Sequence, residues 1–163
     1  MAYWALVVSQ PNKERLAVQN IRNQGYEYYL PMIREKVIRQ GKQIELARPL
    51  FRNYIFTRIQ AQWSSLTGTY GVSGIVLEGR SPQRVPERVI ETLKNRQDKD
   101  GFIRLDEKEE LEKGQTVKIN SGPFEGHIGI YEGMSADERA IVLFKLLGSD
   151  RELRLDPKML VTI

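Results

Sequence analysis

A strongly charged stretch divides this chain and limits what it can fold into. Residues 95–114, NRQDKDGFIRLDEKEELEKG, contain few side chains able to form a core, so they are predicted to be a linker. The parts before and after this stretch are each large enough for one small hydrophobic core, but not for a catalytic scaffold of several layers. We therefore predict a first domain over residues 1–97, a linker over residues 98–113 and a second domain over residues 114–163.

The first part has the pattern of an α+β domain, with helices packed on a mostly antiparallel sheet. Strands are predicted over YWALVVS, YEYYLPMI, RNYIFTRI and VSGIVLEG, because these stretches are rich in β-forming residues. VIRQGKQIEL predicts a hairpin that turns at Gln40 and Gly41. Helices are predicted over PERVIETLKN and over PNKERLAVQNIRNQ, which Gly25 ends. Helical spacing in the latter places four residues on one face: Leu16, Ala17, Ile21 and Gln24.

The second part has the pattern of a small β-barrel, with short strands separated by glycine, proline or acidic turns. Residues 135–148, SADERAIVLFKLLG, allow two interpretations. Ser135 and Glu138 have the spacing of a helix capping box, whereas Ile141 and Val142, together with the strands expected on either side, favour a strand. We favour the strand and keep the helix as the alternative.

The composition argues against most enzyme classes. The chain has no cysteine and one histidine, His127, in a glycine-rich turn, so thiolate and histidine-based sites have little to build on. The acidic cluster over residues 106–112 has no apolar surroundings that would raise a carboxyl pKa. We expect no enzyme activity, no cofactor and no metal; a nuclease using scattered carboxylates is the least favoured alternative.

Charge is distributed unevenly between the two parts. Residues 1–97 hold 15 Lys and Arg against 7 Asp and Glu, a net charge of +8, whereas residues 98–163 hold 10 against 14, a net charge of −4. The first part is therefore the more suitable one to bind a polyanion. No apolar run reaches the roughly 20 residues of a membrane-spanning helix. We expect a soluble, cytoplasmic monomer.

Two groups of motifs resemble one known family. WALVVSQPNKER, GYEYYLPMIREKVIRQGKQIELARPLFRNYIF, GVSGIV and VPERVIETL resemble the N-terminal domain of NusG-type transcription elongation factors, and VKINSGPFEGHIGIYEGM resembles their C-terminal KOW motif. The motifs occur in the order of the family. LPMIREK, RQGK and RPLFRNYIF are most similar to the specialised RfaH branch, which acts on selected operons.

The resemblance implies a factor that binds RNA polymerase, suppresses pausing and termination, and does not catalyse a reaction. Residues 48–56, RPLFRNYIF, are predicted as a strand with one face in the core and the other on the polymerase. Positions that match the surface for the β′ clamp helices are Phe51, Tyr54, Phe56 and Val8. Ser64 and Ser65 match the contact with the β subunit, although this chain has QWSS where RfaH-like proteins have His-Thr-Thr.

The resemblance also implies contacts with the exposed non-template DNA strand and with a small-subunit ribosomal protein. The residues expected at the DNA strand are Lys13, Arg15, Asn20, Arg22, Thr69 and Tyr70. The hairpin cations Arg34, Arg39 and Lys42 are an alternative contact, to duplex DNA. The residues expected at the ribosomal protein, and at Rho in the general branch of the family, are Phe124, Leu146 and Leu147.

In RfaH the C-terminal domain can fold as a helical hairpin against the polymerase-binding surface and refold to a barrel. The switching relative has an acidic residue where this chain has Arg48, and Glu138 is a candidate for restoring the opposite-charge pair. Two rivals to an RfaH-like factor stay open: a general NusG acting with Rho, and a ribosome-associated KOW protein. The DNA element and the target operons are not specified by the sequence.

Overall fold

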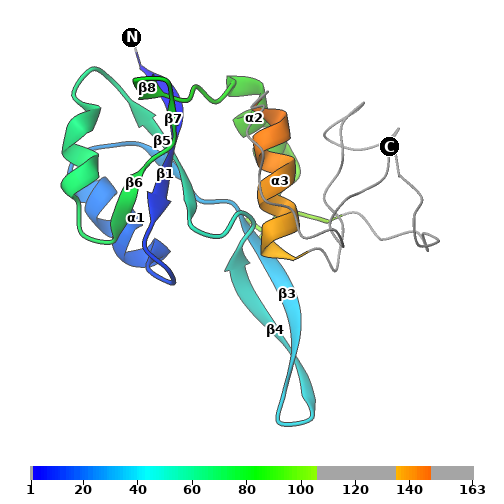
Figure 1. Ribbon diagram of the computed structural model, residues 1–163. Helices are drawn as coiled ribbons and strands as arrows, with labels where there is room; N and C mark the ends of the chain where they lie inside the picture. The colour runs from blue at the N-terminus through cyan, green and yellow to red at the C-terminus, as the bar shows by residue number, and fades with distance from the viewer. Residues whose placement is uncertain (1, 106–134, 148–163) are drawn as a thin grey trace. The chain divides into compact units, whose positions relative to one another are not determined.

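The computed structural model describes residues 2–105 and 135–147. The chain divides into two compact units, Met1–Pro31 with Phe51–Glu91 and Met32–Leu50 with Thr92–Ile163. Figure 1 shows the helices and strands of both units with their labels. The chain therefore passes from the first unit to the second and back within its first 51 residues.

The first unit is built on an antiparallel sheet with the strand order β2-β5-β1-β6. The strand bounds are β1 Tyr3–Ser9, β2 Tyr28–Tyr29, β5 Tyr54–Ile59 and β6 Val72–Ile75. β1 pairs with β5 on one edge and with β6 on the other. Four consecutive residues of β1, Trp4 to Val7, are buried, which indicates that both faces of the strand are covered. The predicted antiparallel sheet is confirmed, although YEYYLPMI contributes only a two-residue strand to it.

Helix α1, Glu14–Asn23, packs its narrow apolar face into the core of the first unit. Ala17 and Ile21 are fully buried beside residues of β1, β5 and β6. The wider face predicted from helical spacing is wrong, because Leu16 is 38% exposed and Gln24 is exposed. Gly25 follows the helix with a φ of +86°, the left-handed conformation predicted for it.

Shorter elements complete the first unit and lead into the second. η1, Trp63–Gly68, is a short 3-10 helix. β7 Leu77–Glu78 and β8 Ser81–Pro82 form a small hairpin. The predicted helix after Pro86 is confirmed as α2, Glu87–Asn95, whose last residues belong to the second unit.

The second unit contains a long two-stranded hairpin, β3 Met32–Arg39 and β4 Lys42–Pro49 (Figure 1). Its turn is at Gln40 and Gly41, as predicted, and both residues have a positive φ, of 52° and 75°. A two-residue turn of this kind matches the right-handed twist of the flanking strands. The hairpin is longer at both ends than VIRQGKQIEL suggested.

The prediction of a continuous strand over residues 48–56 is wrong. β4 ends at Pro49 and β5 begins at Tyr54, with a turn between them. Asn53 has a φ of 69°, a left-handed conformation that interrupts an extended chain and that asparagine adopts more readily than most residues. We call residues 51–54 the docking turn, after the polymerase contact that the sequence predicts for Phe51 and Tyr54.

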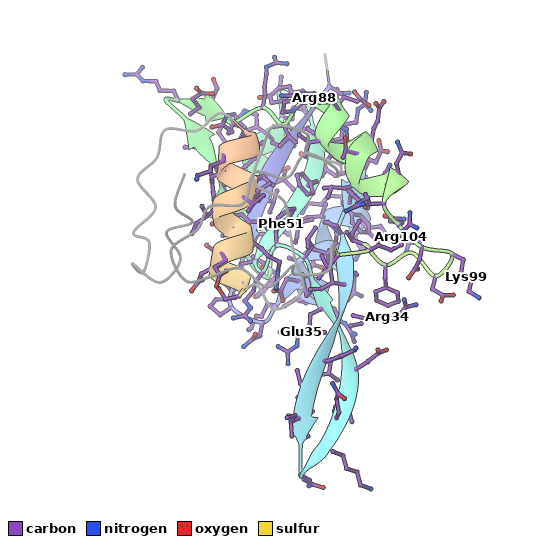
Figure 2. All side chains as sticks on the ribbon, turned by 90° about the vertical axis from the view of Figure 1, so that its right-hand side faces the viewer. Arg34, Glu35, Phe51, Arg88, Lys99 and Arg104 are labelled. Carbon is purple, nitrogen blue, oxygen red and sulfur yellow. The ribbon has the colours of Figure 1, made fainter. Side chains whose placement is uncertain are left out.

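Residues 97–104, predicted as the end of the first domain and the start of the linker, fold back on β3. The N–H of Ile103 donates to the carbonyl of Met32 at 2.8 Å, and Ile103 is buried. Arg34 is labelled in Figure 2. Its guanidinium binds the carboxylates of Asp98 at 2.5 Å and Asp100 at 2.8 Å and lies 4.3 Å from the centre of the Phe102 ring. This part of the charged stretch therefore has defined structure.

The same cluster explains the ionisation of Asp98. Burial opposes the ionisation of this carboxyl. The backbone N–H groups of Phe102 and Asp100 and the Arg34 guanidinium outweigh burial, and they hold the pKa of Asp98 below its usual range. The charged form of Asp98 is thus the form that stabilises the segment from Asp98 to Phe102.

Residues 136–146 form helix α3, Ala136–Leu146, so the strand that we favoured is wrong. Ser135 caps the helix, its hydroxyl accepting from the Glu138 N–H at 3.1 Å. The local capping signal prevailed over the β-forming tendency of Ile141 and Val142. Both residues lie in α3 with buried side chains, as do Leu143 and Phe144. The barrel predicted over residues 114–163 has its remaining segments outside the described residues.

Gly71 allows us to predict the effect of one substitution on stability. Gly71 has a φ of +85°, and an added Cβ would lie 2.8 Å from the backbone nitrogen of Ala17 in α1. We expect Gly71→Ala to lower the free energy of unfolding by more than about 2 kcal/mol, since the left-handed strain alone costs about 1–2 kcal/mol. Gly25→Ala is the matched control, because Gly25 has the same backbone conformation with nothing within 4 Å.

Urea denaturation of both variants measures this difference. Gly25→Ala is expected to show the backbone strain alone, and the excess cost in Gly71→Ala reports the displacement of α1. Equal costs in the two variants would contradict the close approach of Gly71 to α1.

Candidate functional site

The aromatic residues around the docking turn divide into buried and partly exposed ones. Phe51 and Phe56 are fully buried and pack edge to face, with ring centres 6.1 Å apart, and Tyr29 stacks on Phe56 at 6.2 Å. Burial raises the pKa of the Tyr29 phenol above its usual value. In this structure, Phe51 and Phe56 are packing residues, and they do not form the exposed part of the predicted surface.

Tyr54 and Val8 form the accessible part of that surface. Both are half-buried, and they are direct partners in the register of β1 and β5. Cross-strand partners place their side chains on the same face of a sheet. The structure therefore brings two of the four predicted polymerase contacts together as an amphipathic pair; that polymerase binds there stays a prediction.

The docking turn is held from two sides. The N–H of Ser9, the last residue of β1, donates to the Asn53 carbonyl at 2.8 Å. The N–H of Asn53 donates to the carboxylate of Glu14 at 3.3 Å. Within the turn, the N–H of Tyr54 donates to the carbonyl of Phe51 at 3.1 Å. Sequence reasoning missed Glu14, and no local signal singles it out, because its partner lies 39 residues away.

Among the residues predicted at the DNA strand, Asn20 and Tyr70 are bonded directly to each other; contact with DNA stays a prediction. The Asn20 amide donates to the Tyr70 carbonyl at 3.1 Å, which joins α1 to the loop before β6. Tyr70 is 83% exposed, so its ring is available for stacking. The cations Arg15 and Arg22 of α1 are exposed, and so is Lys13, which directly precedes the helix.

Thr69 differs from the other predicted DNA residues. It is buried, its hydroxyl accepts from the Gln24 amide at 2.6 Å, and it donates to the Ser65 carbonyl at 3.0 Å. Thr69 therefore fixes the loop that carries Tyr70, and its side chain is not presented to a ligand.

Ser64 and Ser65 lie exposed in η1, but they are not equivalent. The Ser65 hydroxyl is 2.9 Å from the Tyr26 hydroxyl, which donates to the Gln62 carbonyl at 3.0 Å. Trp63 is partly buried against the core of the first unit. Sequence reasoning missed Tyr26, which anchors the start of η1.

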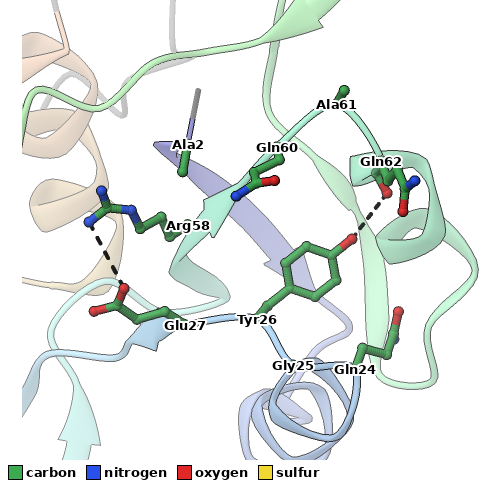
Figure 3. A pocket seen from close by; sticks show the side chains of 9 residues that line it. All are labelled: Ala2, Gln24, Gly25, Tyr26, Glu27, Arg58, Gln60, Ala61 and Gln62. Carbon is green, nitrogen blue, oxygen red and sulfur yellow. Dashed lines mark hydrogen bonds and ion pairs between the residues drawn. The ribbon is translucent and has the colours of Figure 1, made fainter.

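A polar pocket opens beside this anchor (Figure 3). Its volume is about 580 Å³, and the Arg58 guanidinium on its wall lies 4.0 Å from the Glu27 carboxylate. Its polar lining resembles a solvent-filled depression more than the largely apolar pockets that bind small molecules. The lining residues are Ala2, Gln24, Gly25, Tyr26, Glu27, Arg58, Gln60, Ala61 and Gln62.

The hairpin cations differ in their availability. Arg34 is committed to Asp98 and Asp100. Arg39 and Lys42 are exposed cross-strand partners next to the turn, beside Ile38, which is 78% exposed. Of the three cations predicted to contact duplex DNA, Arg39 and Lys42 are thus exposed at the tip of the hairpin, whereas Arg34 is held in two ion pairs.

The residues predicted for the second domain are only partly described. Phe124 lies outside the described residues. Leu146 is the last residue of α3, and Leu147 follows it, buried. Arg48 forms an ion pair with Glu35 at 3.3 Å within the hairpin. The suggested pair between Arg48 and Glu138 does not occur among the ion pairs of the described residues.

The described residues also show what kinds of site they do not form. Within residues 2–105 and 135–147, no group of three or more His, Cys, Asp or Glu side chains is arranged to hold a metal ion. No helix in the same ranges is long and apolar enough to cross a membrane.

Comparison with known proteins gives a consistent family. The model of the NusG family, described as transcription termination factor nusG, matches residues 2–94. Proteins named transcription termination/antitermination protein NusG from Staphylococcus epidermidis and Staphylococcus carnosus are 27% and 26% identical over 152 residues, covering 88% of this chain and 81% of each relative.

The solved structure titled "Domain interaction in Thermotoga maritima NusG" aligns with a TM-score of 0.49 and 20% identity, covering 83% of this chain and 81% of that chain. The two Staphylococcus relatives carry the NusG name, so they do not support the narrower RfaH assignment. Because the family model covers more than half of the sequence, this chain belongs to the NusG family of transcription termination and antitermination factors.

Proposed function

We propose that this protein is an elongation and antitermination factor that binds RNA polymerase and the exposed non-template DNA strand at once, and so suppresses pausing and termination. The observation that carries this proposal lies at the end of β1. The N–H of Ser9 donates to Asn53 of the docking turn, and the N–H of the next residue, Gln10, donates to Gly71 at 2.7 Å, beside Tyr70. Two consecutive residues thus connect the two proposed surfaces.

On the polymerase side, the proposed contact is the pair of Tyr54 and Val8, with the β′ clamp helices as its partner. A tyrosine beside an aliphatic residue offers apolar area and one polar group, a combination common in interface anchors. Phe51 and Phe56 support this pair from within the fold. Ser64 and Ser65 are proposed to reach the β subunit, with Ser64 the freer of the two to bond a partner.

On the DNA side, α1 and Tyr70 suit a single strand. Exposed cations on α1 can hold phosphates, and the Tyr70 ring can stack on an unpaired base. Thr69 is proposed to act only through the position of Tyr70. The non-template strand is the single-stranded DNA that a transcribing polymerase exposes.

We further propose that the protein is an RfaH-like, operon-specific and cytoplasmic factor. α3 supports the idea that the C-terminal segment can be helical. The Nε of Arg139, a buried side chain of α3, donates to the carbonyl of Leu50 at 2.6 Å, and Leu50 directly precedes the docking turn. A KOW barrel that recruits a small-subunit ribosomal protein is the proposed alternative state. A general NusG acting with Rho and a ribosome-associated KOW protein are the rival functions.

Truncation of Tyr54 tests the polymerase contact. We expect Tyr54→Ala to weaken binding to purified RNA polymerase by about tenfold or more, because truncating a central aromatic anchor commonly costs at least 2 kcal/mol. Tyr70→Ala removes the same atoms from the DNA surface and is expected to keep polymerase affinity while weakening binding to a single-stranded oligonucleotide. Chromatin occupancy of the wild type separates the two functions, because an RfaH-like factor is expected at few operons and a general NusG at most genes. Wild-type polymerase affinity in Tyr54→Ala would overturn the assignment of this site.

The hairpin tip gives a second test, on duplex DNA. We expect the double variant Arg39→Gln, Lys42→Gln to reduce the magnitude of the negative slope of log K against log salt by about 2, where K is the binding constant for duplex DNA. Each phosphate neutralised contributes about 0.9 to this magnitude. Arg34→Gln is the control and should leave the slope unchanged, since Arg34 is paired with Asp98 and Asp100. Salt-dependent fluorescence titrations measure both slopes. An equal loss in the control would show that the tip is not the contact.

Substitution of Arg139 tests whether its bond to Leu50 stabilises helix α3, as the proposed switch between helix and barrel requires. We expect Arg139→Met to lose the bond to Leu50 and to speed amide hydrogen exchange in α3 of the intact protein, because the Leu50 carbonyl then lacks this donor. Arg139→Lys, which can still donate, should exchange more slowly than Arg139→Met. If release of α3 activates the protein, Arg139→Met also binds polymerase more tightly. Unchanged exchange in Arg139→Met would argue against this bond as the lock.

A further inference from the structure

Glu14 is a buried acid at the start of α1, between the cations Lys13 and Arg15. Its neighbours Lys13 and Arg15 are exposed, whereas Glu14 is only 9% exposed. Burying a carboxylate is unfavourable unless hydrogen bonds or charges compensate it. Its place in the first turn of α1 provides favourable helix-dipole interaction, and the Asn53 N–H provides a hydrogen bond at 3.3 Å. A side chain that served only to solvate the helix would point outward.

The partner of Glu14 is the one residue of the docking turn with a left-handed backbone. Asn53 has a φ of 69°, and its two main-chain polar groups are held by different elements. The carbonyl accepts from the N–H of Ser9 in β1 at 2.8 Å, and the N–H donates to Glu14 of α1. The Ser9 hydroxyl is 3.5 Å from the Asn53 side-chain oxygen, a weaker contact.

These contacts fix the orientation of the peptide groups on both sides of Asn53. Tyr54 is the next residue, and its own N–H is bonded within the turn to Phe51. The direction in which Tyr54 leaves the turn therefore depends on the conformation of Asn53. Loss of the Glu14 bond would leave the Asn53 N–H without this acceptor, at a position where Asn53 is only partly exposed to water.

We propose that Glu14 is a positioning residue for polymerase binding: it holds the docking turn in the conformation that presents Tyr54, and it does not contact polymerase itself. This inference rests on the proposed function, because it takes Tyr54 as the polymerase contact. It also assigns to α1 a second role beside DNA binding, exerted from its first turn.

The charge of Glu14 gives the two binding reactions opposite expected responses. The carboxylate lies between Lys13 and Arg15 in the sequence, so it lowers the positive charge that a nucleic acid meets there. Removing the acid should therefore leave affinity for single-stranded DNA unchanged or raise it. A variant that was merely unfolded would lose both affinities.

The test compares three variants of the full chain. Glu14→Ala is expected to weaken polymerase binding by about threefold to tenfold, the range of a typical single intramolecular hydrogen bond, without weakening binding to a single-stranded oligonucleotide. Glu14→Gln keeps an oxygen that can accept from the Asn53 N–H, so it should restore most of the polymerase affinity. Glu87→Ala, which removes an exposed first-turn glutamate of α2, is the control and should match the wild type.

Amide hydrogen exchange at Asn53 provides a readout that does not involve polymerase. Exchange should be faster in Glu14→Ala than in the wild type and near the wild-type rate in Glu14→Gln. If Glu14→Ala does not fold, Glu14→Asp replaces it. The Asp side chain keeps the charge but is one methylene shorter, so its carboxylate should not reach the Asn53 N–H. Glu14→Asp should then show the same loss of polymerase affinity.

Tyr54→Ala, measured in parallel, separates a failure of this inference from a failure of the proposed function. If Tyr54→Ala loses affinity while Glu14→Ala and Glu14→Asp retain it, the positioning role is overturned and the polymerase site stands. An equal loss in Glu14→Ala and Glu14→Gln also overturns the role, because it would follow from charge and not from the hydrogen bond. Wild-type affinity in Tyr54→Ala overturns both.

Discussion

The pairing of β1 with strands on both of its edges is the constraint on which the first unit depends. β5 lies on one side and β6 on the other, in antiparallel register. The strand is buried over Trp4 to Val7, so its position cannot shift without disturbing the core. Ser9, the last residue of β1, bonds Asn53, and Gln10, the next residue, bonds Gly71. The two proposed binding surfaces are thus both bonded to the end of one buried strand.

This arrangement explains why the residues of the docking turn have different roles. A regular strand would alternate residues 51–56 between two faces. The left-handed Asn53 breaks the alternation, so Phe51 is buried before the break and Tyr54 starts a new strand after it. Buried phenylalanines then support a partly exposed tyrosine. The difference in exposure between Phe51 and Tyr54 follows from one backbone angle more than from residue type.

Sequence signals that depend on neighbouring residues agree with the structure. The turn at Gln40 and Gly41, the end of α1 at Gly25 and the cap of α3 at Ser135 depend on neighbouring residues, and each was visible in the sequence. Residues 135–148 carried a capping box and β-branched residues together, and the structure followed the capping box. Leu16 was misplaced because the apolar face of α1 is narrower than its spacing suggests.

The sequence by itself determined the α+β class, the hairpin turn, the helix ends and the resemblance to the NusG family, because these depend on contacts between near neighbours or on motifs. Only the tertiary structure decided that Arg34 is occupied by Asp98, 64 positions away, and that Arg139 reaches Leu50, 89 positions away. It also decided that Glu14 meets Asn53 and that Tyr54, not Phe51, is partly exposed. The physical reason is that such contacts join segments far apart along the chain, and local composition does not specify which segments meet.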